Sequence, residues 1–308
     1  MSLAFVFPGQ GSQSVGMLAG LAQVEPTVLH CFSEASDVLG FDLWQLVQQG
    51  PEERLNDTCN TQPAMLAAGV ALWRVWQSRG GALPCLMAGH SLGEYTALVC
   101  AGALHYEDAI ALVADRGRYM QEAVGPGEGA MAAILGLDDG QVIALCEQAA
   151  QGQVVAAVNF NSPGQVVIAG ATSAVERAVE LARDSGARRA IVLPVSVPSH
   201  CILMREAAEK LERRLSEVTI SSPRIPVIHN VDVQTEAGAD AIRSALVRQL
   251  YSPVRWVETV RELARRGVRR VVECGPGKVL AGLNKRIDRS LDIFPVFDED
   301  SLQNAIEK

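Results

Sequence analysis

Short apolar runs alternate with longer amphipathic stretches along most of the chain. Leu3–Phe7 is an apolar run that predicts a buried first strand, and a glycine-rich turn follows it. Leu86–Ala88 predicts a second strand, and Leu92–Ala101, closed by Gly102, predicts the helix directly after it. Strands that alternate with helices in this way are typical of a largely parallel sheet covered by helices. We therefore predict an α/β protein.

The other core elements follow the same pattern. Thr61-Gln62-Pro63 predicts a helix start, with Thr61 as its cap and Pro63 in its first turn. We expect helices over Ala64–Gln77, Glu107–Ala123, Ala239–Leu250, Trp256–Arg266 and Lys278–Ile287, and strands near Val227–Asn230 and Val271–Cys274.

The pattern changes between Gly125 and Pro198, and the stretch Gly125-Pro126-Gly127 has the composition of a hinge. The order of elements there is β-α-β-β-α-β, which is the ferredoxin-like arrangement. We expect strand Ala130–Leu135, helix Asp139–Ala150, strand Val154–Asn159, a turn at 161–164, strand Gln165–Ala169, a helix begun by a capping box at Ser173–Glu176, and strand Ala190–Val195. The prediction is a ferredoxin-like subdomain at 126–197 inserted into a core formed by 1–125 and 198–308.

Composition narrows the possible functions. A length of 308 residues suffices for such a core and insert. The net charge of −8 argues against a general nucleic-acid or anionic-membrane binder, because those partners require an electropositive surface. No apolar run approaches the roughly 18 residues of a membrane helix. The chain starts without a cationic leader, and Pro8 and Gly9 end the first apolar run early, so we expect a cytoplasmic protein. Seven cysteines without a Cys-x-x-Cys pair indicate reduced thiols rather than a disulfide or zinc framework, and we expect no metal and no cofactor.

Gly89-His90-Ser91-Leu92-Gly93 is a G-x-S-x-G sequence between a predicted strand and a predicted helix. Glycine at both flanks lets the backbone turn sharply while the serine Oγ projects from the sheet edge. The helix that follows brings free N–H groups beside the serine, and the N–H of Leu92 is the natural donor to an oxyanion. The alternative is a serine that only caps a helix in a tight turn. We predict Ser91 as a nucleophile.

A serine nucleophile needs a base, and the chain has five histidines. Nothing around His30 or His105 suggests chemistry, and His90 is too close to Ser91 in the chain to take its proton. His200, at the return from the insert to the core, is favoured moderately over His229. A Cys201–His200 dyad is disfavoured, because adjacent side chains do not face each other.

Two other features stay open on the residues alone. Arg116 lies in an amphipathic helix where most arginines face solvent, although its guanidinium could bind a carboxylate through two parallel hydrogen bonds. Gly9-Gln10-Gly11 could be a phosphate cradle, but it lacks the glycine fingerprint and the lysine of nucleotide-binding loops. It could instead bring backbone N–H groups to Ser91.

Several motifs, in order over most of the chain, resemble the bacterial malonyl-CoA:acyl carrier protein transacylases of type II fatty acid synthesis. They are Phe7-Pro-Gly-Gln-Gly-Ser12, Thr61-Gln-Pro-Ala64, Gly89-His-Ser-Leu-Gly-Glu94, Arg116-Gly117, Asn159-Phe-Asn-Ser-Pro-Gly-Gln165, Val197-Pro-Ser-His200 and Glu273-Cys-Gly-Pro-Gly277. The resemblance implies an α/β-hydrolase-like core with a ferredoxin-like insert.

The resemblance also implies roles for residues. It implies Ser91 as nucleophile, His200 as general base and later general acid, the backbone carbonyl of Gln249 as the group that orients His200, and Arg116 as the ligand of the malonyl carboxylate. It further implies the N–H groups of Gln10 and Leu92 as the oxyanion hole, and Gln62 as a residue that lines the substrate site.

The implied reaction is ping-pong transfer of malonyl from malonyl-CoA to the phosphopantetheine thiol of holo acyl carrier protein. An acidic carrier requires a local basic patch on this acidic chain, and ordinary solvated charges are the alternative reading of the candidates. The candidates are Arg183, Arg188, Arg189, Lys285 and Arg286. The competing functions are a related acyltransferase of polyketide or malonate decarboxylase systems, a serine hydrolase, and a non-catalytic carrier-binding scaffold.

Overall fold

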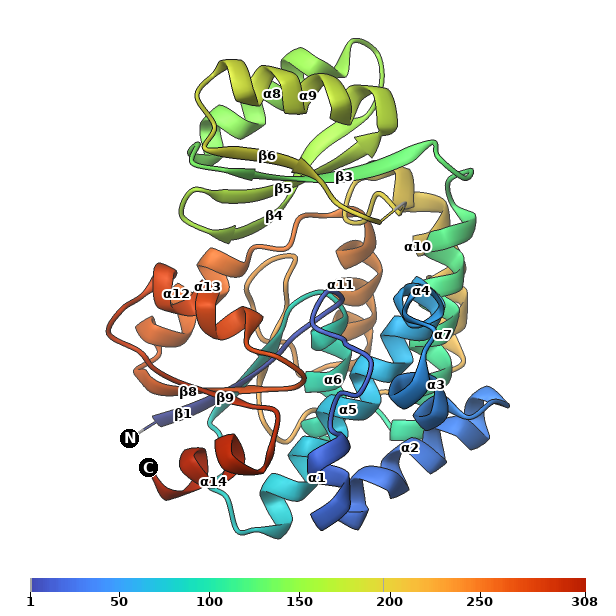
Figure 1. Cartoon of the computed structure of the whole chain (residues 1–308), viewed down its shortest axis with the longest axis vertical. Helices are drawn as coiled ribbons and strands as arrows, with labels where there is room; N and C mark the ends of the chain where they lie inside the picture. Colours follow the sequence, from blue (N-terminus) through green and yellow to red (C-terminus); the bar gives the residue numbers. More distant parts are fainter. Residues whose placement is uncertain (1, 196) are drawn as a thin grey trace.

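The computed structural model describes residues 2–195 and 197–308, and its strands form two separate sheets. The five-stranded sheet, in the lower half of Figure 1, is wholly parallel with the order β7-β2-β1-β8-β9. The four-stranded sheet above it is antiparallel with the order β4-β5-β3-β6. The prediction of an α/β protein with a mostly parallel sheet is confirmed, and an antiparallel sheet accompanies it.

The elements in chain order are β1 (Ser2–Phe7), α1 (Ala19–Val24), α2 (Pro26–Leu39), α3 (Leu43–Gln49), α4 (Glu52–Asn56), α5 (Thr58–Ser78), β2 (Leu86–Gly89), α6 (Leu92–Cys100), α7 (Tyr106–Glu122), β3 (Gly129–Leu135), α8 (Asp139–Ala150), β4 (Val155–Ser162), β5 (Gln165–Ala171), α9 (Thr172–Asp184), β6 (Arg189–Val192), the 3-10 turn η1 (Ile202–Met204), α10 (Arg205–Ser216), β7 (Val227–Ile228), α11 (Ala239–Tyr251), α12 (Trp256–Arg265), β8 (Val268–Cys274), α13 (Val279–Ile287), β9 (Asp292–Val296) and α14 (Glu299–Glu307).

Side chains of β1 alternate between two apolar cores, as the two-residue period of a strand requires. Phe5 faces α5, where its ring lies 5.1 Å from the rings of both Trp73 and Trp76. Val6 points to the other face and belongs to the cluster that α12 and α13 complete, with Trp256 at its centre. The central parallel sheet is therefore covered on both faces, and the carboxyl ends of its strands point toward the antiparallel sheet.

The antiparallel sheet has its own core with α8 and α9, and its other face meets the rest of the chain. The backbone of Val254 donates to the carbonyl of Val158 at 2.8 Å and accepts from the N–H of Phe160 at 3.0 Å. The connection between α11 and α12 is thus joined to the antiparallel sheet by main-chain hydrogen bonds along β4.

Two predicted helix starts are wrong. The helix α5 begins at Thr58, so Thr61 and Pro63 lie inside it, because the Thr61 hydroxyl donates to the carbonyl of Leu55 at 2.6 Å rather than capping the helix. The helix α9 begins at Thr172, and Ser173 makes no capping box because its hydroxyl bonds the Gln153 side chain at 3.0 Å. In both cases the hydroxyl bonds a residue outside its own helix, Leu55 of α4 for Thr61 and Gln153 after α8 for Ser173.

Two predicted strands are shorter than expected. The strand β6 ends at Val192 rather than Val195, because its ladder with β3 ends there. The strand β7 covers only Val227–Ile228, and the next residues leave the sheet. No prediction covered α1 to α4, α10, β9 or α14.

Among residues 2–195 and 197–308, no helix has both the length and the apolar character needed to cross a membrane.

Candidate active site

Ser91 occupies a sharp turn between β2 and α6. Its φ of 52° and ψ of −107° lie outside the regions that a non-glycine residue ordinarily adopts. A Cβ at Gly89 would lie 1.9 Å from the carbonyl carbon of Gly93, and a Cβ at Gly93 would lie 2.0 Å from the carbonyl oxygen of Phe7. Both glycines of the motif are therefore required by close backbone approach, and the strand–turn–helix context predicted for the motif is confirmed.

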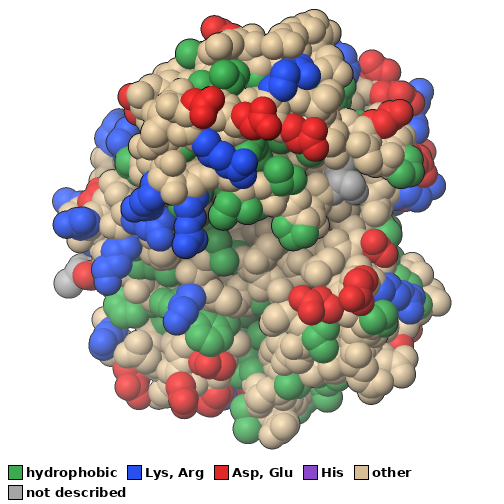
Figure 2. All heavy atoms as spheres, turned by 45° about the horizontal axis from the view of Figure 1, so that its top comes forward, with side chains coloured by type: hydrophobic (Ala, Val, Ile, Leu, Met, Phe, Trp, Pro, Cys, Tyr) green, Lys and Arg blue, Asp and Glu red, His purple; other side chains and the backbone are tan. Residues whose placement is uncertain are grey.

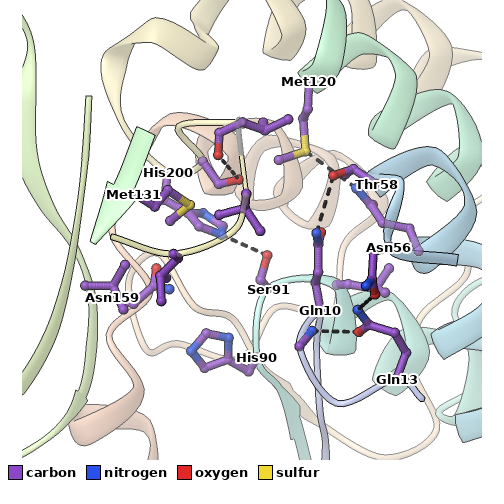
Figure 3. A pocket seen from close by; sticks show the side chains of 18 of the residues that line it. Gln10, Gln13, Asn56, Thr58, His90, Ser91, Met120, Met131, Asn159 and His200 are labelled. Atoms are coloured by element: carbon purple, nitrogen blue, oxygen red, sulfur yellow. Dashed lines mark hydrogen bonds between the residues drawn. The ribbon is translucent and has the colours of Figure 1, made fainter. Parts of the chain in front are cut away.

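His200 faces Ser91 across the chain, from the segment that follows the antiparallel sheet (Figure 3). Its Nε2 lies 2.8 Å from Ser91 Oγ, and its Nδ1 lies 2.8 Å from the backbone carbonyl of Gln249. A carbonyl only accepts, so Nδ1 carries the proton and Nε2 is free to accept from the serine hydroxyl. The sequence preference for His200 as the base agrees with this geometry.

Burial and the nearby Arg116 guanidinium lower the pKa of His200 from 6.5 to about 3. The imidazole is therefore neutral at neutral pH, which is the form that accepts a proton.

We expect acylation of Ser91 to depend little on pH between about pH 5 and pH 8, because His200 stays unprotonated throughout that range. The measurement is the single-turnover rate of acyl-ester formation on Ser91, with circular dichroism at each pH to show that the fold persists. A loss of rate centred near 6.5, the pKa of an ordinary histidine, would contradict this result.

Arg116 is buried, with 1% of its surface exposed, although sequence spacing alone favoured a solvent-facing side chain. Its Nη1 donates to Gln62 Oε1 at 2.7 Å, and its Nη2 donates to Gln249 Oε1 at 2.9 Å and to Ser91 Oγ at 3.2 Å. None of these partners is a carboxylate. Gly117 lets α7 approach this closely, because a Cβ there would lie 2.7 Å from the Cα of Cys59 at the start of α5. Packing of α7 on α5 therefore turns Arg116 inward.

The side chains of His229 and His90 have hydrogen-bond partners other than Ser91. His229 Nδ1 lies 2.7 Å from Glu94 Oε1, and although burial disfavours a charged ring, Glu94 raises the pKa of His229. His90 turns its ring away from the serine (Figure 3). Its Nε2 lies 2.8 Å from Asn161 Oδ1. The Cys201 thiol is buried against the carbonyl of Pro198 at 3.1 Å, so it makes no dyad with His200.

Two polar residues that sequence reasoning missed hold the turn. Asn230 Oδ1 accepts from the N–H of Ser91 at 2.7 Å, and its Nδ2 donates to the carbonyl of Gly89 at 2.6 Å. Glu94, in the first turn of α6, is fully buried and accepts from the N–H of Asn230 at 2.9 Å. A charged residue within the apolar helix that follows the serine was the only signal for this group in the sequence.

A cavity of about 300 Å³ opens above Ser91 and is lined from both sheets. Gln10, Gln62 and Leu92 line it on the side of the parallel sheet, and Met131, Asn159 and the segment 193–195 line it on the side of the antiparallel sheet. Gln10 is exposed at the rim and its side chain donates to Thr58 Oγ1 at 3.4 Å (Figure 3). The cavity brings together every catalytic and substrate residue expected from the sequence except Gln249, which lies behind His200 and Arg116.

The expected docking residues are exposed on α9, on β6 and the turn before it, and on α13. Leu135 of β3 pairs with Arg189 of β6 on one side and with Gln165 of β5 on the other. Arg286 of α13 donates to Gln165 Oε1 at 2.8 Å, so Arg286 contacts the sheet two strands away from Arg189. Figure 2 shows Lys and Arg side chains gathered to the left of a central hollow.

Comparison with known proteins agrees with this site. Residues 4–293 match the acyl transferase domain family. The chain is 59% identical to the malonyl CoA-acyl carrier protein transacylase of Salmonella typhimurium over 303 residues, covering 98% of each chain. It is 60% identical to the Haemophilus influenzae protein of the same name over 306 residues, covering 99% of this chain and 98% of the other.

A solved structure of a type II PKS acyl-carrier protein in complex with its malonyl-transacylase is also similar. It has a TM-score of 0.99 and 59% identity, and the match covers 100% of this chain and 99% of that one. Family match, sequence identity and fold agree over the whole chain, which therefore belongs to the malonyl CoA-acyl carrier protein transacylases of the acyl transferase domain family.

Proposed function

We propose that this enzyme transfers the malonyl group from malonyl-CoA to the phosphopantetheine thiol of holo acyl carrier protein, and so supplies malonyl carrier protein for fatty acid biosynthesis. The observation that carries the proposal is a serine–histidine pair that shares its cavity with a buried arginine. In residues 2–195 and 197–308 that arginine has no carboxylate within ion-pair distance. A buried guanidinium with only neutral partners is matched to a substrate that brings its own carboxylate.

In the first half-reaction, His200 Nε2 takes the proton of the Ser91 hydroxyl as Oγ attacks the thioester carbonyl of malonyl-CoA. The tetrahedral oxyanion collapses, the carbon–sulfur bond breaks, and the CoA sulfur leaves with the proton returned by His200. The product is a malonyl ester on Ser91.

In the second half-reaction, the carrier thiol gives its proton to His200 and its sulfur attacks the ester carbonyl. The bond to Ser91 Oγ breaks, Oγ regains the proton, and the malonyl thioester leaves on the carrier. The same imidazole therefore acts as base and then as acid in each half.

Backbone N–H groups of Gln10 and Leu92 would stabilise the oxyanion. Leu92 is the first residue of α6, so its N–H belongs to the positive end of the helix beside Ser91. Gln10 follows β1 in a loop at the rim of the same cavity. Gln62 would contact the malonyl group, because it holds Arg116 Nη1 at the cavity wall.

The Gln249 carbonyl takes the place that Asp or Glu has in most serine triads. A neutral acceptor fixes the His200 tautomer without adding negative charge beside an anionic substrate. This arrangement favours binding of the malonyl carboxylate.

The test is a two-step transfer followed by intact-protein mass. Malonyl-CoA alone should leave a stable malonyl adduct on the enzyme, and holo carrier protein should then remove it while apo carrier protein does not. Absence of any adduct would support a non-catalytic scaffold, and rapid loss of the adduct to water would support a hydrolase.

A polyketide carrier is the second candidate acceptor, because a similar transacylase was solved with a type II PKS acyl-carrier protein. Parallel transfer to a fatty-acid carrier and a polyketide carrier separates the two acceptors by their ratio of kcat/KM.

We also propose Arg189, Lys285 and Arg286 as part of the carrier docking surface. Reversing Arg189 and Lys285 together to Glu should raise the apparent KM for the carrier by about 5- to 10-fold at low salt and leave the KM for malonyl-CoA unchanged. The matched control is Arg213→Glu, an exposed arginine on α10, which lies on the opposite side of Figure 1 from α13. Equal effects of the control and the double reversal would remove the docking proposal.

The finer fold assignment is likewise a proposal. We propose an α/β-hydrolase-like core at 1–125 and 198–308 with a ferredoxin-like subdomain at 126–197. Separate sheets and separate apolar clusters support this division, and the strand order β4-β5-β3-β6 supports the ferredoxin-like topology. The cytoplasmic location expected from the sequence stays a prediction.

A further inference from the structure

Glu94 accepts hydrogen bonds from three residues around the active site and touches none of the reacting atoms. Its Oε1 lies 2.7 Å from His229 Nδ1. Its Oε2 accepts from the N–H of Asn230 at 2.9 Å and from Gln249 Nε2 at 2.8 Å. The carboxylate is fully buried, so these partners hold it in one orientation.

Gln249 connects Glu94 to both Arg116 and His200 through hydrogen bonds. Its side-chain Nε2 donates to Glu94 Oε2 and also to the carbonyl of Ser91 at 3.1 Å. Its Oε1 accepts from Arg116 Nη2, while its backbone carbonyl accepts from His200. The side chain of Gln249 therefore holds the Arg116 guanidinium, and its main-chain carbonyl holds the His200 imidazole.

The orientation of the Gln249 side-chain amide determines whether its oxygen or its NH₂ group contacts the Arg116 guanidinium. A carboxylate and a carbonyl only accept, so the amide NH₂ must face Glu94 and Ser91. The amide oxygen then faces the guanidinium. With the amide reversed, its oxygen would lie against a buried carboxylate and its NH₂ against a buried cation, and both contacts are unfavourable.

We infer that Glu94 is a positioning residue that sets the preference for acyl groups ending in a carboxylate, by fixing the Gln249 amide that holds Arg116. This inference rests on the proposed function. Glu94 does not pair with Arg116 itself, because His229, Asn230 and Gln249 occupy its two oxygens. The guanidinium is thus held in place and stays available to the substrate.

The test compares kcat/KM for malonyl-CoA and acetyl-CoA in acylation of Ser91. Glu94→Ala should lower the malonyl-to-acetyl ratio about 10-fold or more, the size expected for losing a hydrogen bond to a charged group. Gln249→Met should lower the ratio similarly, because it removes the side chain and keeps the carbonyl that orients His200. The double variant should lose no more than either single variant, because both act through one contact.

Conservative and matched variants separate positioning from folding. Glu94→Gln should keep most of the ratio, since an amide oxygen still accepts from Gln249. Glu273→Gln is the control, because Glu273 is equally buried but holds the start of α13 through the N–H groups of Leu280 and Ala281. A merely structural role would lower the amount of folded enzyme and leave the ratio unchanged.

A wild-type ratio in Gln249→Met overturns the inference even if Glu94→Ala fails to fold. Additive losses in the double variant, or a loss in Glu94→Gln as large as in Glu94→Ala, also overturn it. If the wild-type chain forms no malonyl ester at all, the proposed function fails instead, so the two failures are distinguishable.

Discussion

Ser91→Ala is expected to abolish the malonyl adduct and to lower transfer to holo carrier protein by at least about 10⁴-fold, as loss of an activated nucleophile does in other serine enzymes. The reason is geometric. Ser91 Oγ is the hydroxyl that lies 2.8 Å from His200 Nε2, on a strained turn that two glycines make possible. Without it, no ester forms and the ping-pong sequence cannot begin. Intact-protein mass after mixing with malonyl-CoA measures the adduct directly.

The control is Ser199→Ala, which removes a second hydroxyl from the same cavity. Among residues 2–195 and 197–308, the partner of Ser199 Oγ is the carbonyl of Val197, at 3.4 Å, so the adduct should persist. A malonyl adduct on the Ser91→Ala protein would mean that another residue accepts the acyl group.

Arg116→Ala is expected to lower malonyl acylation by about 10²-fold or more while changing acetyl acylation little, because an unpaired malonyl carboxylate would then be buried. The guanidinium sits between Gln62 and Gln249 with Nη2 at 3.2 Å from Ser91 Oγ, within reach of an acyl group on that oxygen. Parallel single-turnover acylation with malonyl-CoA and acetyl-CoA gives the ratio of the two acylation rates.

The matched control is Arg118→Ala, two residues along the same helix. Arg118 is 55% exposed and pairs with Asp115 at 2.7 Å, so its loss should leave the ratio unchanged. The assay belongs near pH 8, because the charge of Arg116 helps to lower the pKa of His200, and its removal raises that pKa. If Arg116→Ala keeps the preference for malonyl-CoA over acetyl-CoA, another residue recognises the carboxylate.

Local sequence chemistry predicted the strand–turn–helix context of Ser91 well. The requirement for glycine on both sides of Ser91 follows from backbone contacts within one turn, and short-range motifs record such contacts. The order of elements in the insert was also readable, because each strand and helix has its own hydrophobic period.

The direction in which a side chain points relative to neighbouring helices and strands could not be predicted from local sequence patterns. Arg116 turns inward only because α7 packs closely on α5 at Gly117. His200 and His229 were hard to separate because both follow strands of the core or insert. Their hydrogen-bond partners separate them. His229 contacts the carboxylate of Glu94, whereas His200 contacts the Ser91 hydroxyl and the backbone carbonyl of Gln249. Those contacts join residues more than 40 positions apart, and no local pattern encodes them.

The role of Gln249 came only from the family resemblance, and the residues alone left the role of Gln10 open between a phosphate cradle and a donor to Ser91. Both roles use backbone atoms, and a backbone carbonyl or N–H leaves no signature in residue type. The missed helix starts have a similar cause, since the hydroxyls of Thr61 and Ser173 find acceptors outside their own helices.

The walls of the cavity above Ser91 come from two sources. Ser91 and His200, which exchange the proton, lie outside the stretch 129–195, whereas Met131, Asn159 and 193–195 all belong to it. One wall of the cavity and the proton-transfer pair thus come from different parts of the chain. Substitutions within that stretch are therefore expected to reshape this wall while the contact between Ser91 Oγ and His200 Nε2 is kept.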